Sequence, residues 1–474
     1  MSSHISQALL RYARRKSRRR EPDPLLIELF ERRFAEFGVE AGDFPFAFSV
    51  CDVGGVPTYS ISVLLSQDRL SSMREVVEEI SLGLDPARVN PLDFSKLVQL
   101  LTEDAARCLA RREMGVRVKE LSELCAYEAI GLSRILALAK DQKVTEFYVD
   151  SDTSCVYLDH SEEGRCNTSI VLTERERKAV ETHMDTFRGY TLDYANPSMK
   201  NDLEVSGARL RVSLDLAPAS VNRFSLDVRR LEISSLSLEA LVEWDVLSAE
   251  AAAFLVAWLE IGGNLTVVGE TGTGKTTLLN ALDEKLDPML RRVYVEDAVE
   301  TKDLIDRGYH QLKIKVDPFE RSEGVLKRKE TEVVKALHRS PDLVILSEIQ
   351  SEEHSRAFFH ALSAGVRGIQ TFHASTIEQA LRRWTSIHGV EKDNLLDLGV
   401  LVQMYRPERL RPRRLVARVT EVVEEEGEPR VRELYTRDRE GKLRRVAKWE
   451  MVRPPEGRSS SDLQARVLAA AEGR

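Results

Sequence analysis

The chain has 474 residues, which is more than one hydrophobic core usually holds, so two or three domains are expected. Hydrophobic residues make up 42% and charged residues 31%, a globular composition, and no window approaches a bilayer-spanning apolar run or a signal peptide. The formal charge of −8 also argues against a nucleic-acid binder. These features predict a cytoplasmic protein that reaches a membrane only through partners.

The first twenty residues are basic, unlike the chain as a whole, because they contain a basic block and no acidic residue. Its members are Arg11, Arg14, Arg15, Lys16, Arg18, Arg19 and Arg20. Such a block can contact anionic lipid or an acidic partner, or it can be a solvated, frayed terminus. The five scattered cysteines include no Cys-x-x-Cys pair, which argues against a disulfide framework and a zinc site.

Two regions precede the main domain. Residues 1–115 combine a helical pattern after Pro24 with alternating stretches on both sides of Gly54-Gly55, which predicts a hairpin beside helices. Residues 116–235 alternate between helical and strand-like spacing and end in two or three arginine-rich antiparallel strands, which predicts an α+β domain.

A connector is expected at 236–248, where Ser248 can cap an apolar helix over 249–261. Residues 249–474 then alternate short apolar strands with helices, and an antiparallel strand extension follows Leu410. The strands are expected at 265–268, 293–295, 343–346 and 369–372. This pattern is typical of an α/β fold with a mostly parallel, helix-covered sheet.

The strongest motif runs from Gly269 to Thr277 and matches the Walker A pattern G-x-x-x-x-G-K-[ST]. An apolar strand precedes it and a helix follows, as a phosphate-binding P-loop requires. Lys275 can reach the β- and γ-phosphates of ATP, and the Thr276 hydroxyl can bind Mg²⁺. The predicted nucleotide-binding residues are Gly269, Thr271, Gly272, Thr273, Gly274, Lys275, Thr276 and Thr277.

Acidic residues and one histidine follow later strands of the same domain. Glu296 and Glu348 each stand at the carboxyl end of an apolar strand, where open α/β sheets keep their ligands. His373 stands at the end of another strand. Taken singly, each residue could equally be a solvated carboxylate or a structural histidine.

The order of these motifs resembles the type II/type IV secretion ATPase superfamily, which includes motors of type IV pili, the archaellum and tight-adherence pili. The resemblance covers roughly residues 145–404 and rests on the Walker A motif, the Glu296-Asp297-x-x-Glu300 box, the strand ending in Glu348, and the G-x-x-G-x-x-T-x-H-A box with His373. It implies a homo-hexameric ring of RecA-like domains, each preceded by an α+β domain.

The resemblance also implies roles for individual residues. Glu296 is expected to be the Asp-box acid, Glu348 the Walker B acid that polarises water and holds Mg²⁺ through water, and His373 the γ-phosphate sensor. Three arginines of the preceding domain, Arg209, Arg211 and Arg229, match the region that closes over nucleotide in such rings. Ordinary surface ion pairs are the alternative for each arginine.

Three positions depart from the family pattern. Ser347 stands where glycine is usual, Gln350 where arginine is common, and Val366 where a further histidine is common. These departures are expected to affect the turnover rate and the coupling between subunits, and not the binding of nucleotide.

The sequence thus predicts an ATP hydrolase that moves a polytopic membrane platform protein and, through it, pilin-like or secreted substrates. Two alternatives stay open: a conjugation-type ATPase that moves DNA or effectors, and a ring component that binds ATP with little hydrolysis.

Overall fold

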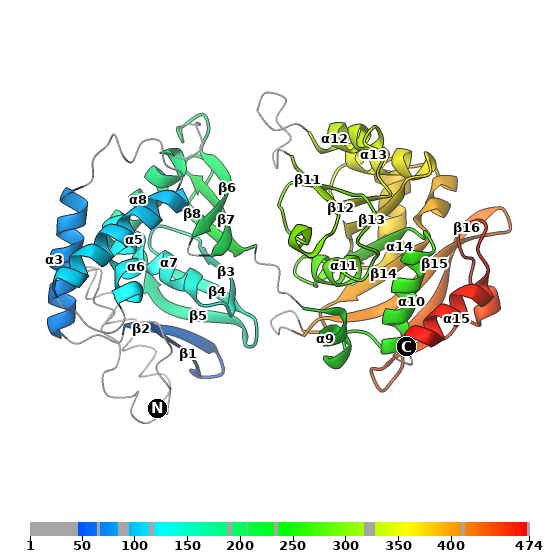
Figure 1. Cartoon of the computed structure of the whole chain (residues 1–474), viewed down its shortest axis with the longest axis horizontal. Helices are drawn as coiled ribbons and strands as arrows, with labels where there is room; N and C mark the ends of the chain where they lie inside the picture. Colours follow the sequence, from blue (N-terminus) through cyan, green and yellow to red (C-terminus); the bar gives the residue numbers. More distant parts are fainter. Residues whose placement is uncertain are drawn as a thin grey trace. The chain divides into compact units, whose positions relative to one another are not determined.

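The computed structural model describes nine stretches of the chain, which are residues 46–63, 67–83, 94–112, 118–186, 192–205, 207–231, 236–316, 328–408 and 413–471 (Figure 1). The basic block and the helix expected after Pro24 lie outside them. The described residues up to Leu231 form one compact unit, and those from Leu236 onward form a second. No helix in these stretches has both the length and the apolar composition that a bilayer crossing requires.

An eight-stranded sheet is the centre of the first unit, in the order β1-β2-β5-β4-β3-β8-β7-β6. Its strands are β1 (Phe46–Asp52), β2 (Pro57–Val63), β3 (Val144–Val149), β4 (Cys155–His160), β5 (Gly164–Val171), β6 (Ser198–Val205), β7 (Ala208–Leu216) and β8 (Phe224–Arg230). Neighbouring strands are antiparallel except β2 and β5, which are parallel. The expected hairpin is β1–β2.

Five helices accompany this sheet: α3 (Gln67–Leu82), α5 (Phe94–Arg111), α6 (Val118–Ala129), α7 (Ser133–Lys140) and α8 (Glu174–Thr186). Their buried side chains and those of the strands form a single hydrophobic core. One tie across this core is the hydrogen bond from the Tyr59 hydroxyl on β2 to Oδ2 of Asp141, at 2.8 Å. The two regions that we expected on either side of residue 115 therefore share one sheet and one core.

A nine-stranded sheet is the centre of the second unit, in the order β11-β10-β12-β13-β9-β14-β15-β16-β17. Its strands are β9 (Leu265–Gly269), β10 (Arg292–Glu296), β11 (Gln311–Lys315), β12 (Leu343–Ile349), β13 (Arg367–His373), β14 (Val400–Tyr405), β15 (Leu415–Glu425), β16 (Glu428–Arg437) and β17 (Leu443–Arg445). The six strands from β11 to β14 pair in parallel, and β14 to β17 pair antiparallel. The predicted fold class, an α/β P-loop core preceded by an α+β unit, is confirmed.

The helices of the second unit are α9 (Leu238–Glu243), α10 (Ala249–Glu260), α11 (Lys275–Asp283), α12 (Lys329–Leu337), α13 (Glu352–Ser363), α14 (Ile377–Arg382) and α15 (Ser460–Ala471). As expected, Ser248 caps α10 by accepting a hydrogen bond from the Ala251 amide at 3.3 Å. The expected connector 236–248 contains α9, and the tail beyond the strand extension contains α15, which packs against α10 (Figure 1).

The inner parallel strands β9, β10 and β12 are buried without alternation because both faces of the sheet are covered. On β9, Val267 belongs to one hydrophobic core and Val268 to another. Each successive side chain of a strand points to the opposite face, so burial on both faces requires an unbroken apolar run. This burial places the polar residues of the motifs at the strand ends.

Candidate functional site

Residues 269–276 join β9 to α11 through a tight loop. Gly272 and Gly274 have positive φ angles of 75° and 91°, a conformation that side chains other than glycine rarely adopt. A Cβ atom on Gly269 would lie only 2.5 Å from Oγ1 of Thr273, so glycine is required there as well. The loop ends where α11 starts, so the positive end of that helix lies at the loop, as in phosphate-binding sites.

The Lys275 ammonium group connects the loop to the neighbouring strand. Its Nζ donates hydrogen bonds to the carbonyl oxygens of Gly269 and Glu270, both at 2.9 Å, and lies 3.3 Å from Nδ1 of His373. His373 is the last residue of β13, which pairs directly with β9. The other ring nitrogen, Nε2, contacts Oε1 of Glu348. Polar contacts thus run from the P-loop lysine through His373 to Glu348.

Glu348 lies where the ladder between β12 and β13 is irregular. Leu346 pairs with Gln370 and Ile349 with Phe372, so β12 contains one residue more than β13 in this interval. A bulge of this kind changes the direction of a side chain. Burial acts to raise the pKa of Glu348, but the hydrogen bond from His373 and the charge of that imidazole outweigh it, and the pKa lies below its usual value.

Two of the three departures from the family pattern, Ser347 and Gln350, lie beside this contact, whereas Val366 precedes the other end of β13. The carbonyl of the buried Ser347 accepts a hydrogen bond from the Thr371 hydroxyl. The carbonyl of Gln350 accepts one from Arg383 at 2.9 Å, and the same guanidinium donates to the His373 carbonyl at 2.9 Å. Arg383 therefore ties the ends of β12 and β13 together. We did not predict this residue, since nothing in its local sequence indicates a role at the site.

A second set of contacts lies around Thr276. The Thr276 hydroxyl donates to Oε2 of Glu300 at 3.1 Å, and Asn280, one turn further along α11, donates to the Glu300 carbonyl at 3.0 Å. Glu300 is part of the acidic box that the sequence revealed, but we chose its first acid, Glu296, as the functional one. The position of Glu300 beyond the strand end was the signal that could have identified it.

Glu296 has a different environment from the one we expected. It is the last residue of β10, is 0% exposed, and its Oε1 accepts hydrogen bonds from the amides of Glu300 and Thr301, both at 3.1 Å. Its Oε2 accepts a third from the Thr301 hydroxyl at 2.7 Å. Burial raises the pKa of this carboxyl above its usual value. Glu296 thus anchors the loop that carries Glu300.

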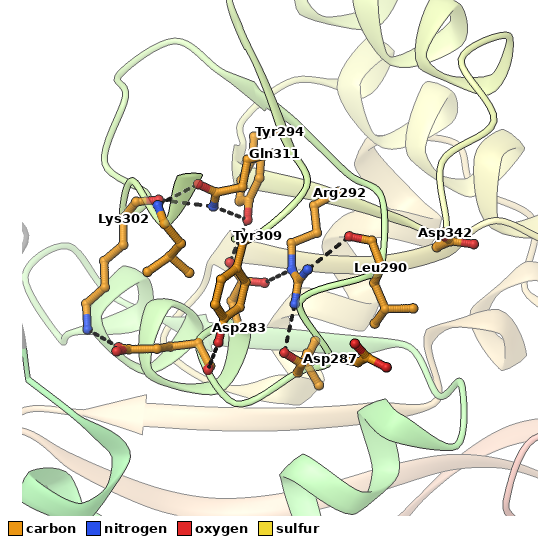
Figure 2. Close-up of polar contacts among 12 residues, drawn as sticks. Asp283, Asp287, Leu290, Arg292, Tyr294, Lys302, Tyr309, Gln311 and Asp342 are labelled. Atoms are coloured by element: carbon orange, nitrogen blue, oxygen red, sulfur yellow. Dashed lines mark hydrogen bonds and ion pairs between the residues drawn. The ribbon is translucent and has the colours of Figure 1, made fainter. Parts of the chain in front are cut away.

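A buried polar cluster fixes the other end of α11 (Figure 2). Arg292, the first residue of β10, is 0% exposed and donates from Nε to Oδ1 of Asp283 at 2.8 Å. The Tyr294 hydroxyl donates to Oδ2 of Asp283 at 2.7 Å and accepts a hydrogen bond from Gln311. The last residue of the P-loop helix is therefore held to the strand that ends in Glu296.

The three predicted arginines lie in the first unit. Arg209 and Arg211 alternate with buried residues on β7 and share one face of the sheet, as expected, and Arg229 lies opposite Arg211 on β8. Nε of Arg211 lies 3.0 Å from Oδ1 of Asp202, and the side chain of Arg211 is 11% exposed, whereas Arg229 is exposed.

The oxygen-bearing groups near the loop suit a hard cation. Thr276 and Glu300 are within hydrogen-bond distance of each other, and Mg²⁺ prefers such oxygen ligands together with substrate phosphates. Among the described residues, no group of three His, Cys, Asp or Glu side chains could hold a metal by itself. The Thr276 hydroxyl and the Glu300 carboxylate fit a Mg²⁺ ion that arrives with a nucleotide. Of the other predicted nucleotide-binding residues, Thr271 is an exposed loop residue and Thr277 is on α11.

Residues 197–416 match a family model described as "Type II/IV secretion system protein". The matched segment includes the whole P-loop, Glu300, Glu348 and His373. It also includes the three arginines of the first unit.

The chain is also similar to individual proteins. An uncharacterized protein of Methanocaldococcus jannaschii is 28% identical over 260 residues, which are 54% of this chain and 45% of that protein. The type IV secretion system protein PtlH of Bordetella pertussis is 34% identical over 134 residues, which are 28% of this chain and 38% of that protein. The chain thus spans less than half the length of either relative. The Legionella pneumophila ATPase DotB superposes with a TM-score of 0.45 at 15% identity, over 62% of this chain and 81% of DotB.

Proposed function

Because residues 197–416 match the family model of type II/IV secretion system proteins, we propose that this chain hydrolyses ATP with Mg²⁺ to drive a secretion or pilus-type machine. The observation that supports this most is the double contact at the P-loop. Lys275 reaches Glu348 through His373, and Thr276 reaches Glu300. Two consecutive residues at the helix end of the loop are therefore linked to two different carboxylates.

We assign the roles as follows. The loop amides and Lys275 bind the β- and γ-phosphates, and Mg²⁺, when bound with Thr276, neutralises charge on those phosphates. Glu348 accepts the proton of the attacking water, and His373 senses whether a γ-phosphate is present. Glu300, instead of Glu296, supplies the carboxylate next to the magnesium ligand.

The Lys275→Ala variant tests the assignment. It removes the point charge aimed at the β- and γ-phosphates, so ATP turnover should be abolished and nucleotide binding weakened. Turnover is measured by phosphate release with and without Mg²⁺, and binding with a fluorescent ATP analogue. Lys285→Ala is a matched control because that lysine is part-exposed and paired with Glu239 at the surface. Near wild-type turnover in Lys275→Ala would refute the P-loop assignment.

We also propose a homo-hexamer in which arginines of the first unit complete the nucleotide site. Arg229 is the best candidate because it is exposed, whereas Arg211 lies beside Asp202. An arginine that reaches the transferred phosphate can contribute on the order of a thousandfold in rate. Arg229→Ala should lower turnover far more than binding, with Arg209→Ala and Arg211→Ala as comparisons. Turnover per subunit should also rise with protein concentration. Flat turnover on dilution, with all three variants fully active, would contradict the ring.

The proposed partners are a polytopic membrane platform protein and, indirectly, pilin-like or secreted substrates, with the chain held at the cytoplasmic face of the membrane. The similarity to PtlH favours a second candidate, an ATPase of a type IV secretion system that moves effectors or DNA. Co-purification from membranes discriminates the two, because a pilus motor should bring down a pilin-assembly platform. A chain that binds ATP without hydrolysing it would support the third possibility, a ring component.

A further inference from the structure

Lys329 is a buried cation beside the two acid-bearing strand ends, and the family motifs do not include it. It is the first residue of α12 and is 1% exposed. Lysine is rarely buried to this degree unless it is paired. A positive charge is also unfavourable at a helix N-terminus, where the helix dipole is positive. Neither solvation nor local helix stability therefore explains a lysine here.

The contacts of Lys329 explain its position. Its Nζ lies 3.1 Å from Oδ1 of Asp297 and donates a hydrogen bond to the carbonyl oxygen of Glu348 at 2.7 Å. Asp297 directly follows the last residue of β10, and Glu348 is near the end of β12. These two strands are neighbours and pair in parallel. One ammonium group thus joins the ends of both strands.

The contact with Glu348 is to the backbone of the proposed catalytic acid. Glu348 lies in the bulge between Leu346 and Ile349, where the regular ladder to β13 is interrupted. A backbone carbonyl in such an interval needs a donor other than the next strand. Lys329 supplies that donor, while the side chain of the same residue contacts His373.

The contact with Asp297 has an electrostatic consequence. Asp297 is buried, and its negative charge lies close enough to Glu348 to disfavour a second negative charge there. The ammonium group compensates the Asp297 charge. Removing one partner of a buried ion pair leaves the other charge uncompensated.

We propose that Lys329 is a positioning residue, which holds the ends of β10 and β12 together through the Asp297 carboxylate and the Glu348 carbonyl so that Glu348 can act in hydrolysis. This inference rests on the ATP hydrolysis proposed above. It predicts that Lys329 affects the chemical step and has little effect on nucleotide binding, because it contacts no part of the P-loop among the interactions described.

The test compares three variants of the full chain with the wild type: Lys329→Met, the double variant Lys329→Met/Asp297→Asn, and Lys335→Met. Lys335 is a matched control, since it lies on the same helix and pairs with Glu332 at 2.7 Å, but its side chain is 48% exposed. Single-turnover hydrolysis and the affinity for a fluorescent ATP analogue are measured separately, and circular dichroism reports folding.

In Lys329→Met, hydrolysis should fall by about tenfold to a hundredfold, because small displacements of a catalytic group cause losses of this size. The affinity for the ATP analogue should change by less than about threefold. The double variant removes the uncompensated charge of Asp297 but does not restore the hydrogen-bond donor to the Glu348 carbonyl. Its hydrolysis should therefore lie between those of the single variant and the wild type. Lys335→Met should match the wild type.

Equal losses of affinity and hydrolysis, unchanged hydrolysis in Lys329→Met, or a double variant no better than the single one would each overturn the inference. If Lys329→Met does not fold, the double variant decides: hydrolysis below wild type at unchanged affinity supports the inference, and wild-type hydrolysis overturns it. A wild-type chain without hydrolysis would instead refute the proposed function, so the two failures are distinguishable.

Discussion

The carboxyl ends of β10 and β12 are neighbours in the sheet and both carry a glutamate, yet the two carboxylates have opposite environments. Glu296 is buried and accepts three hydrogen bonds from its own loop. Glu348 is partly exposed and contacts His373. The same residue type at the same edge of a sheet can thus be a structural anchor or a reactive group.

The difference comes from the ladder around each residue. Glu296 still pairs with Lys315 of β11, so its strand is regular up to its last residue. Glu348 lies in a one-residue irregularity between β12 and β13, which frees its side chain from the regular alternation. Whether a strand-end acid is available for chemistry therefore depends on where the regular pairing stops.

The variant Glu348→Gln has the largest expected effect and tests most directly whether Glu348, unlike Glu296, acts in hydrolysis. The amide keeps the shape of the side chain but cannot accept the proton of water, so hydrolysis should fall by about a hundredfold to a thousandfold while ATP stays bound. Single-turnover hydrolysis and nucleotide affinity are measured separately. Equal losses in both would show that Glu348 is structural, and full retention of hydrolysis would move the role to another carboxylate.

A smaller effect is expected from the pair Glu300→Gln and Glu296→Gln. Glu300→Gln should lower the apparent affinity for Mg²⁺ during turnover by about tenfold or more, since it changes the partner of the predicted magnesium ligand Thr276. The free energy of unfolding should be unchanged within about 0.5 kcal/mol.

Glu296→Gln should show the reverse pattern. Its new amide nitrogen cannot accept the hydrogen bonds that one carboxylate oxygen accepts now, so the second unit should lose about 1–3 kcal/mol of unfolding free energy. The magnesium dependence should change only through that loss. Denaturant titration and a Mg²⁺ titration of turnover give the two quantities, and a selective magnesium defect in Glu296→Gln would restore our original assignment.

The smallest expected effect is on the pH dependence of stability, and it has opposite signs at the two sites. The raised pKa of Glu296 means that its stabilising contribution is present at low pH and is lost as the pH rises through that pKa. The lowered pKa of Glu348 means that its contribution is present near neutrality and is lost as the pH falls through that pKa. Thermal unfolding from about pH 3, below the usual pKa of a glutamate, to about pH 8 tests this.

As the pH rises, the stability of Glu348→Gln should fall relative to that of the wild type. The stability of Glu296→Gln should rise relative to that of the wild type over the same range. Glu424→Gln, at an exposed position of β15, serves as the reference for the change of formal charge. Parallel pH profiles for the two variants would contradict the opposite environments of these carboxylates.

Four of the six parallel strands of the second sheet, β9, β10, β12 and β13, could be predicted from sequence because each contains a short buried run and helices separate them. The strands β11 and β14 were not among those expected, and β11 is only partly buried. The P-loop could be predicted because Gly272 and Gly274 are required by the backbone itself. Both properties depend on residues close together in the chain. The position of Ser248 as a helix cap is a local property of the same kind.

The missed residues depend on contacts between distant segments. Lys329 and Arg383 act on backbone carbonyls of Glu348 and Gln350, and no local pattern indicates which carbonyl a side chain reaches. The sequence also did not indicate that Glu296, the first acid of the box, still lies inside the ladder. The strand extends one residue beyond the expected 293–295, and Glu296, which is that residue, is buried.

The parallel contact between β2 and β5 has a consequence for how the first unit folds. Its ladder joins Thr58 to Asn167 and Tyr59 to Thr168, so the contact closes a loop of more than a hundred residues. The antiparallel pairs of this sheet, by contrast, mostly join neighbouring segments. Loop-closure entropy disfavours such distant pairings early in folding. The β1–β2 hairpin should therefore dock late, and its amide hydrogens should exchange with solvent sooner than those of β4 and β7.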